Sequence, residues 1–191
     1  MYAIGGQKVV QMSSKFLALP LPGCYEIRSE VFTDDRGSFR KSFSREAFVR
    51  RGLYCDFVES YTTVSRQGVL RGMHFQAPPH DHTKLVTCLT GAVIDVILDL
   101  RKASGHYGKY CAVELSEAAG NALYIPSGLA HGFFVPRGTA MMAYWVTSAH
   151  SPSHDCGIAY DSFGFFWPCE TPTLSHRDRS FGTFADFLTP F

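Results

Sequence analysis

The chain has 191 residues, 46% hydrophobic and 14% aromatic, a composition that suits one globular domain with a substantial core. Its formal net charge of +1 gives no indication of nucleic acid or a membrane surface as a partner. The six cysteines form no C-x-x-C pair, and with no signal peptide or membrane-length apolar run they indicate reduced thiols in a cytoplasmic protein: Cys24, Cys55, Cys88, Cys111, Cys156 and Cys169.

No repeat, low-complexity block or linker divides the sequence, so residues 1–191 are predicted to form a single domain. An N-terminal arm is expected over about 1–24 and a short helical segment over about 176–188. A further short helix is predicted over 45–51. Ser44 can cap it, Glu46 lies in its first turn, and Gly52 follows as a C-terminal stop.

The strongest pattern in the chain is that of β-strands. In "GAVIDVILDL" (91–100) successive residues alternate between two faces, with Val93, Asp95 and Ile97 on one and Ile94, Val96 and Leu98 on the other. Further strands are predicted over 109–116, 121–127, 131–138 and 139–148, separated by turns rich in Gly, Pro and Ser. Short, regularly spaced strands with few helices predict an all-β jelly-roll sandwich.

The stretch "VLRGMHFQAPPHDHTKLV" (69–86) carries three histidines. His80 and His82 follow "APP" and are predicted to be loop residues without a functional role. His74 lies on a predicted strand, whose alternation would place it with Gln76 and opposite to Arg71. Cationic and amide side chains around a histidine suit an anionic, oxygen-rich ligand.

A metal site is the competing interpretation of these histidines. The segment 120–134 resembles the second motif of the cupin superfamily, with Gly120, Pro126, Gly128 and His131 at its defining positions. The first cupin motif needs a glutamate four or five residues after H-x-H, and this chain has Val86 and Thr87 there. We therefore expect the cupin-like sandwich without a bound metal. A metal-dependent cupin enzyme, with His80, His82 and His131 as ligands, is the alternative.

Six segments in chain order resemble the dTDP-4-dehydrorhamnose 3,5-epimerase family over roughly residues 25–180. They are "FTDDRGSF" (32–39), "VLRGMHFQ" (69–76), "YIPSGLAHGF" (124–133), "AYWVTSAHSP" (143–152), "GIAYD" (157–161) and "LSHRD" (174–178). The resemblance implies a cupin-like jelly roll that works as a homodimer and needs no cofactor. It also implies an enzyme that inverts the centres flanking the ketone of a 4-keto-6-deoxy sugar on a nucleoside diphosphate. A non-catalytic sugar-binding domain of the same fold is a third possibility.

Such an epimerase needs a base for the proton next to the ketone, a positive charge at the enolate oxygen and an acid on the opposite face. The resemblance implies that His74 is the base, oriented by Asp178, that Lys84 stabilises the enolate and that Tyr144 is the acid. The expected substrate-binding residues are Arg36, Arg71, Gln76, His131, Arg177, His150, Glu59 and Tyr61.

The sequence departs from the family pattern at three places. Lys41 stands where a glutamate is typical, and "ESYT" (59–62) replaces a "Q-D-N-H" run that contacts the thymine base, which predicts a carrier other than dTDP. "SAHSP" (148–152) replaces "NYYSP" and puts Ala149 and His150 in place of two aromatic residues. A changed pocket wall makes inversion of C3 only or C5 only the alternative to inversion at both centres.

Overall fold

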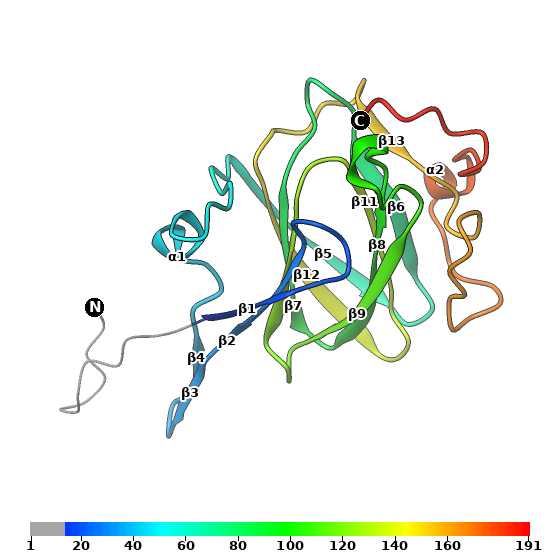
Figure 1. Cartoon of the computed structure of the whole chain (residues 1–191). Helices are drawn as coiled ribbons and strands as arrows, with labels where there is room; N and C mark the ends of the chain where they lie inside the picture. The colour runs from blue at the N-terminus through cyan, green and yellow to red at the C-terminus, as the bar shows by residue number, and fades with distance from the viewer. Residues whose placement is uncertain (1–13) are drawn as a thin grey trace.

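The computed structural model describes residues 14–191. It is a sandwich of two antiparallel sheets with two short helices and one turn of 3-10 helix, so the all-β jelly-roll prediction is confirmed (Figure 1). The first sheet has the strand order β1 (Ser14–Ala18), β2 (Tyr25–Ser29), β10 (Asn121–Ile125), β7 (Lys84–Thr90), β12 (Thr139–Val146) and β5 (Glu59–Arg66). The second sheet has the order β13 (Asp155–Gly157), β6 (Leu70–Gln76), β11 (Leu129–Phe134), β8 (Ala92–Asp99) and β9 (Tyr110–Ser116). A separate hairpin of β3 (Val31–Asp34) and β4 (Gly37–Arg40) projects from the sandwich.

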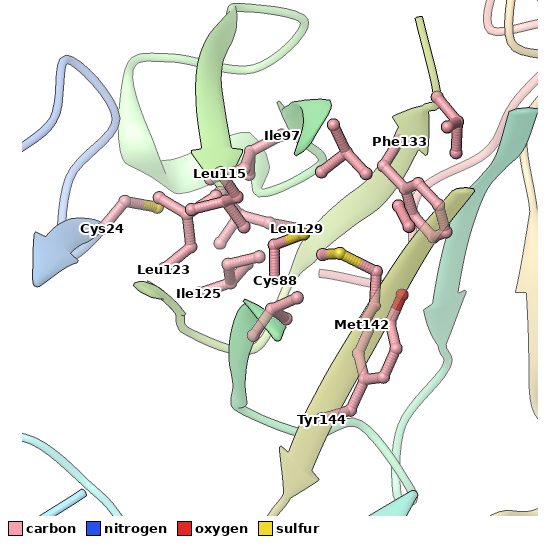
Figure 2. Packing of buried hydrophobic residues seen from close by; sticks show 14 of the residues in the cluster. Cys24, Cys88, Ile97, Leu115, Leu123, Ile125, Leu129, Phe133, Met142 and Tyr144 are labelled. Atoms are coloured by element: carbon pink, nitrogen blue, oxygen red, sulfur yellow. The ribbon is translucent and has the colours of Figure 1, made fainter. Parts of the chain in front are cut away.

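The predicted alternation along β8 explains how the two sheets pack. Val93 and Ile97 belong to the hydrophobic core between the sheets, which Figure 2 shows. Val96 and Leu98 belong to a second core on the outer face of the second sheet, which the chain from Ile158 onward covers. Each fully buried aliphatic side chain contributes about 1.5–3 kcal/mol. Both faces of the second sheet are therefore apolar, and a polar side chain on either face needs a specific partner.

The predicted helix over 45–51 is present as α1 (Arg45–Val49). Ser44 is at the N-cap position, but its side chain makes no capping hydrogen bond. Arg50 donates to Glu46 at 2.8 Å, and Gly52 ends the turn with a φ of 68°. The helix therefore forms where expected, two residues shorter.

Part of the segment 176–188 is helical, as expected: α2 (His176–Arg179) forms at its start. After α2 the chain is non-helical and packs the rings of Phe184, Phe187 and Phe191 against the second sheet. Burial of aromatic area outweighs the weak helix preference of a segment that contains Gly182.

The predicted N-terminal arm, 1–24, lies outside the described residues in its first thirteen positions. Its remainder contains β1, which pairs with β2 along the edge of the first sheet. No helix among residues 14–191 is long and apolar enough to cross a membrane.

Candidate active site

A pocket of about 400 Å³ opens between the two sheets, a size typical of small-molecule sites. Strands β5, β7 and β12 of the first sheet and β6, β11 and β13 of the second provide its walls. Among the residues predicted from sequence, it brings together Glu59, Tyr61, Arg71, His74, Gln76, Lys84, His131, Tyr144, His150 and Arg177.

His74 and Asp178 are 104 positions apart in the chain, and the fold joins them. His74 Nε2 lies 2.7 Å from Asp178 Oδ1, and the His74 ring lines the pocket. Asp178 is buried in α2, where its backbone N–H donates to the Ser175 hydroxyl at 3.0 Å. The single turn of α2 is thereby held against β6. Because the carboxylate accepts from Nε2–H, the neutral imidazole has its lone pair on Nδ1.

The protonation of this pair follows from its surroundings. Burial lowers the pKa of His74, the Asp178 carboxylate opposes this, and the net pKa lies below the ordinary value. Burial raises the pKa of Asp178, but the hydrogen bond and charge of His74, the Ser175 hydroxyl and the Arg177 charge together outweigh it, and the net pKa is lowered. At neutral pH the pair is therefore a neutral imidazole beside a carboxylate, the form that can accept a proton.

Lys84 reaches across the sandwich from β7 in the first sheet. Its Nζ donates to the His74 carbonyl oxygen at 3.1 Å, and the residue is buried. Burial lowers the pKa of Lys84 to about 8, partly offset by the charges of Asp155 and Asp95. The ammonium is charged at neutral pH and lies beside His74, where it could stabilise negative charge on a bound carbonyl oxygen.

Tyr144 lies on β12, so it faces the pocket from the sheet opposite His74. Its ring stacks on Tyr61 of β5 with a centroid distance of 4.7 Å and an interplanar angle of 15°. Burial raises the pKa of Tyr144 well above its usual value, so its phenol keeps its proton. A base and a protonated phenol thus reach the pocket from opposite sides.

A second His–Asp pair lies beside the first. His131 of β11 is the direct cross-strand partner of His74, and its Nε2 lies 2.7 Å from Asp95 Oδ2 on β8. Burial raises the pKa of Asp95, and its Oδ1 has no hydrogen-bond partner among the described residues.

Arg71 lies in the pocket together with His74, contrary to the strict alternation expected from the sequence. Gly72 lies between them with a φ of 142°, and the pairing of β6 with β11 shifts register beside it. A Cβ on Gly72 would lie 2.5 Å from the Gly132 Cα, so the two strands approach too closely for a larger residue. This irregularity lets Arg71 and His74 share one cavity.

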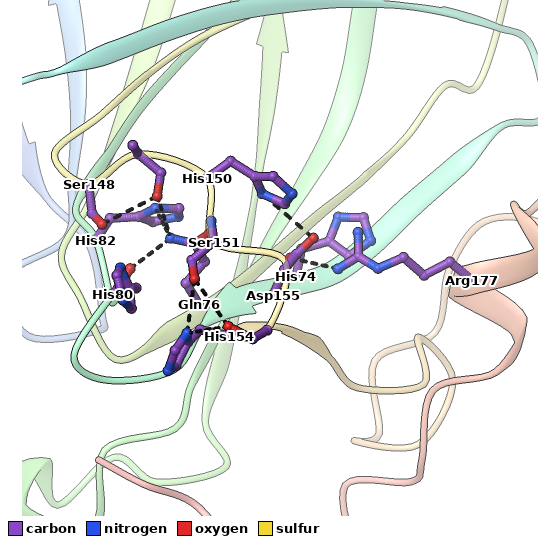
Figure 3. Close-up of polar contacts among 12 residues, drawn as sticks. His74, Gln76, His80, His82, Ser148, His150, Ser151, His154, Asp155 and Arg177 are labelled. Carbon is purple, nitrogen blue, oxygen red and sulfur yellow. Dashed lines mark hydrogen bonds and ion pairs between the residues drawn. The ribbon is translucent and has the colours of Figure 1, made fainter.

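Arg71 and Arg177 supply positive charge at the pocket wall. Arg71 Nε donates to the Ser65 hydroxyl at 2.9 Å, and Arg177 forms an ion pair with Asp155 at 2.6 Å (Figure 3). His150 lies 3.9 Å from the same Asp155 carboxylate. With Lys84 they form a mainly cationic lining that suits a diphosphate.

The Gln76 side chain forms hydrogen bonds within the protein. Its amide nitrogen lies 2.7 Å from the His80 carbonyl oxygen and 3.2 Å from that of Ala149, and its oxygen accepts from the Ser151 N–H. These bonds join two loops at the pocket mouth, which Figure 3 shows. Gln76 lines the pocket as predicted, but its polar groups already have protein partners.

Two expectations about placement need correction. Arg36 lies at the exposed tip of the β3–β4 hairpin, paired with Asp34, and does not line the pocket of its own chain. His82, predicted to be incidental, lies in a loop and does line the pocket, whereas His80 packs against His154 outside it. Residues after a proline-rich turn follow no periodicity, so the sequence carried no signal for this difference.

The metal hypothesis can be compared with the placement of its ligands. No group of three or more His, Cys, Asp or Glu side chains within residues 14–191 is placed to hold a metal ion. His80 packs against His154 with an interplanar angle of 42°, and His131 bonds to Asp95, so the three histidines of the cupin alternative are not placed as one set of ligands.

The fold and the site define a cupin-like sandwich whose pocket has a neutral imidazole paired with a carboxylate on one wall and a protonated phenol on the opposite wall. The family model for dTDP-4-dehydrorhamnose 3,5-epimerase matches residues 18–186. The chain therefore belongs to this family of isomerases, which epimerise nucleotide-linked 4-keto-6-deoxy sugars, and the predicted resemblance is confirmed.

Relatives agree with this assignment. The chain is 37% identical to the dTDP-4-dehydrorhamnose 3,5-epimerase of Methanothermobacter thermautotrophicus, covering 87% of this chain and 92% of that one. It is 40% identical to that of Escherichia coli K12, covering 85% and 90% respectively.

Solved structures agree as well. The Bacillus anthracis enzyme of the same name, crystallised with TDP and PPi, has a TM-score of 0.87 and 31% identity, covering 90% of this chain and 99% of that one. A 3'-monoepimerase from Streptomyces bikiniensis in complex with dTDP-quinovose has a TM-score of 0.83 and 27% identity, covering 87% and 86%.

Proposed function

We propose that this enzyme inverts C3 and C5 of a dTDP-linked 4-keto-6-deoxyhexose, with His74 as base, Asp178 as its orienting partner, Lys84 at the enolate oxygen and Tyr144 as acid. The observation that carries this proposal is the His74–Asp178 hydrogen bond of 2.7 Å on the pocket wall opposite Tyr144. A proton next to a ketone becomes removable when the charge moves onto the carbonyl oxygen. Inversion then requires that a proton return from the opposite face.

Each step has a residue suited to it. Neutral His74 takes the carbon-bound proton at Nδ1, and Asp178 stabilises the imidazolium that forms. The Lys84 ammonium balances the enolate oxygen inside a buried site, where a charge acts more strongly than in water. Tyr144 then donates its phenolic proton to the carbanion carbon from the opposite sheet. Solvent exchange returns both residues to their starting states.

The carrier is proposed from the cationic wall and from relatives. Arg71 and Arg177 would hold the diphosphate, because a guanidinium grips phosphate oxygens in a bidentate way. Glu59, Tyr61 and His150 at the pocket edge are the proposed contacts of the nucleoside and sugar. Where the name of a relative specifies the nucleotide carrier, that carrier is dTDP. We therefore adopt dTDP in place of the different carrier that "ESYT" suggested.

Incubation of the enzyme with dTDP-4-keto-6-deoxyglucose in deuterated water tests the reaction. The proposal predicts deuterium at both C3 and C5, read by proton NMR, together with inverted products. Absence of label at both carbons would contradict an epimerase acting on this substrate. A parallel panel with UDP-, CDP- and GDP-linked substrates would overturn the assigned carrier if one of them reacted faster.

Epimerisation at a single centre is the second candidate. It rests on Ala149 and His150, which replace bulkier aromatic residues at the pocket mouth, and on the relative that is a 3'-monoepimerase. A wider wall would let the sugar present only one of its two acidic hydrogens to His74. Deuterium at one carbon only, even after complete conversion, would establish this candidate in place of the first.

The proposed assembly is a homodimer and the proposed compartment is the cytoplasm. The N-terminal strands expose apolar side chains, with Leu17 of β1, Val31 of β3 and Phe39 of β4 each at least 40% exposed. A second chain packed there would remove this surface from water. Six free thiols suit a reducing compartment. Light scattering that gives one chain per particle would contradict the dimer.

A further inference from the structure

Tyr61 lies directly opposite Tyr144 at the open edge of the first sheet. Strand β5 is the last strand of that sheet, and its Tyr61 is the cross-strand partner of Tyr144 on β12. Directly opposite residues of an antiparallel pair project from the same face of a sheet. Both side chains line the pocket, so two tyrosines stand side by side on the wall that faces His74.

The Tyr144 ring is held by aromatic contacts from both sheets. The Tyr61 ring is stacked on it, with a centroid distance of 4.7 Å and an interplanar angle of 15°. The His131 ring approaches it from the second sheet, at a centroid distance of 6.1 Å and an angle of 75°. A tyrosine side chain turns about only two bonds, so these contacts fix the direction in which the Tyr144 hydroxyl points.

The two tyrosines differ in exposure. Tyr61 is 39% exposed, whereas Tyr144 is 5% exposed. Because β5 is the outermost strand, the stacked Tyr61 ring covers the side of Tyr144 that would otherwise face the sheet edge and water. Burial is the main reason that the pKa of Tyr144 is raised, so this cover also helps the phenol to keep its proton.

We propose that Tyr61 is a positioning residue, which holds the Tyr144 ring in the orientation that delivers its phenolic proton to the sugar carbon. This inference rests on the proposed function, in which Tyr144 is the acid. The phenol O–H bond breaks as the electron pair of the enolate forms the new carbon–hydrogen bond. A misplacement of about 1 Å can slow such a step by roughly 10²-fold. Without its stacking partner the Tyr144 ring would be free to turn away. Tyr61 itself gives up no proton in this role.

Three substitutions separate positioning from support of the strand. Tyr61→Ala removes the stack, and we expect kcat for inversion to fall roughly tenfold. Exchange of the substrate hydrogen should fall less, because His74 can still remove and return it. Tyr61→Phe keeps the ring and should recover most of the loss. Val64→Ala is the matched control and should leave kcat unchanged, because Val64 is on the same strand, opposite Met141 and outside the pocket.

A double-mutant cycle tests whether Tyr61 acts through Tyr144. In the Tyr144→Phe background the phenolic proton is absent, so adding Tyr61→Ala should slow inversion no further. Tyr61→Leu fills the space without an aromatic ring, should show the same loss as Tyr61→Ala, and serves if the alanine variant does not fold.

Three outcomes would overturn the inference. A tenfold loss that persists in the Tyr144→Phe background would mean that Tyr61 acts on the substrate directly. A loss in Tyr61→Phe as large as that in Tyr61→Ala would assign the effect to the Tyr61 hydroxyl. Wild-type inversion in Tyr61→Ala would show that the stack is not needed. Failure of the proposed function is distinguishable, because the wild-type enzyme would then incorporate no deuterium into any 4-keto sugar.

Discussion

The molecule contains two His–Asp pairs on neighbouring strands, and they differ in what surrounds them. Both have a nitrogen-to-oxygen distance of 2.7 Å. The His74 side chain is 27% exposed and its partner Asp178 4%, whereas His131 is 5% exposed and Asp95 is fully buried. Distance alone therefore does not distinguish a base from a structural pair.

The difference lies in the carboxylates. The pKa of Asp178 is lowered because its hydrogen bonds and nearby positive charges together outweigh burial, so it stays ionised beside a neutral His74 and occupies Nε2, not Nδ1. The pKa of Asp95 is raised because the carboxyl group is buried, and one of its oxygens is unsatisfied. Its ionised form, which would orient a base, is therefore less favoured than that of Asp178. We infer that the first pair moves the proton, while the second fixes the pocket wall.

The largest effect should come from removing the two imidazoles in turn. His74→Ala should slow deuterium incorporation at the reacting carbon by roughly 10²–10⁴-fold, because a positioned base is lost. His131→Ala should slow it by only about tenfold, because the altered pocket wall positions the bound sugar less well against His74. Equal losses in the two variants, measured by NMR under saturating substrate, would show that the pairs do not differ in role.

Substitution of the two carboxylates should impair different properties, catalysis for Asp178 and stability for Asp95. Asp178→Asn should lower kcat by about 10²-fold or more, because the amide no longer fixes the His74 tautomer or stabilises the imidazolium. Asp95→Asn should instead lower the free energy of unfolding by about 1–3 kcal/mol, since it adds an unsatisfied buried N–H. Urea titration and kcat on the same preparations check both, and a reversal of the two patterns would refute the assignment.

Tyr144→Phe tests whether the proton is removed and returned from opposite faces of the sugar. Removal of the phenolic proton donor should slow inversion by about 10²-fold, because reprotonation from the far side is lost. Exchange of the substrate hydrogen should fall less, since His74 can still remove and return it from its own side. Inversion and exchange that decline in parallel would place the proton donor elsewhere.

The pH profile should show the smallest effect. Lys84 must be charged to stabilise the enolate, so kcat/KM should fall as pH rises through its pKa of about 8, close to tenfold by one unit above it. On the acid side, activity should fall only below the ordinary histidine pKa of about 6.5, because the pKa of His74 is lowered. Lys84→Arg should remove the decline of kcat/KM at alkaline pH. A decline that remains in this variant would show that another group causes it.

Periodic features of this fold were predictable from sequence, and irregular ones were not. The two faces of β8 follow from alternation, because strand geometry forces it. The contact between His74 and Asp178 spans 104 positions and was accessible only through the family resemblance. Arg71 was assigned to the wrong face because Gly72 breaks the alternation, and His82 was passed over because loop residues follow no period.

Proton removal by His74 requires a neutral imidazole whose proton lies on Nε2, toward Asp178, so that Nδ1 can accept the proton of the substrate. Nitrogen-15 NMR of histidine-labelled enzyme, with the signal assigned by its loss in His74→Asn, reads the tautomer directly. We expect the neutral Nε2–H form at pH 7 and protonation only below about pH 6.5. An imidazolium or an Nδ1–H tautomer at pH 7 would contradict the assignment of His74 as the base.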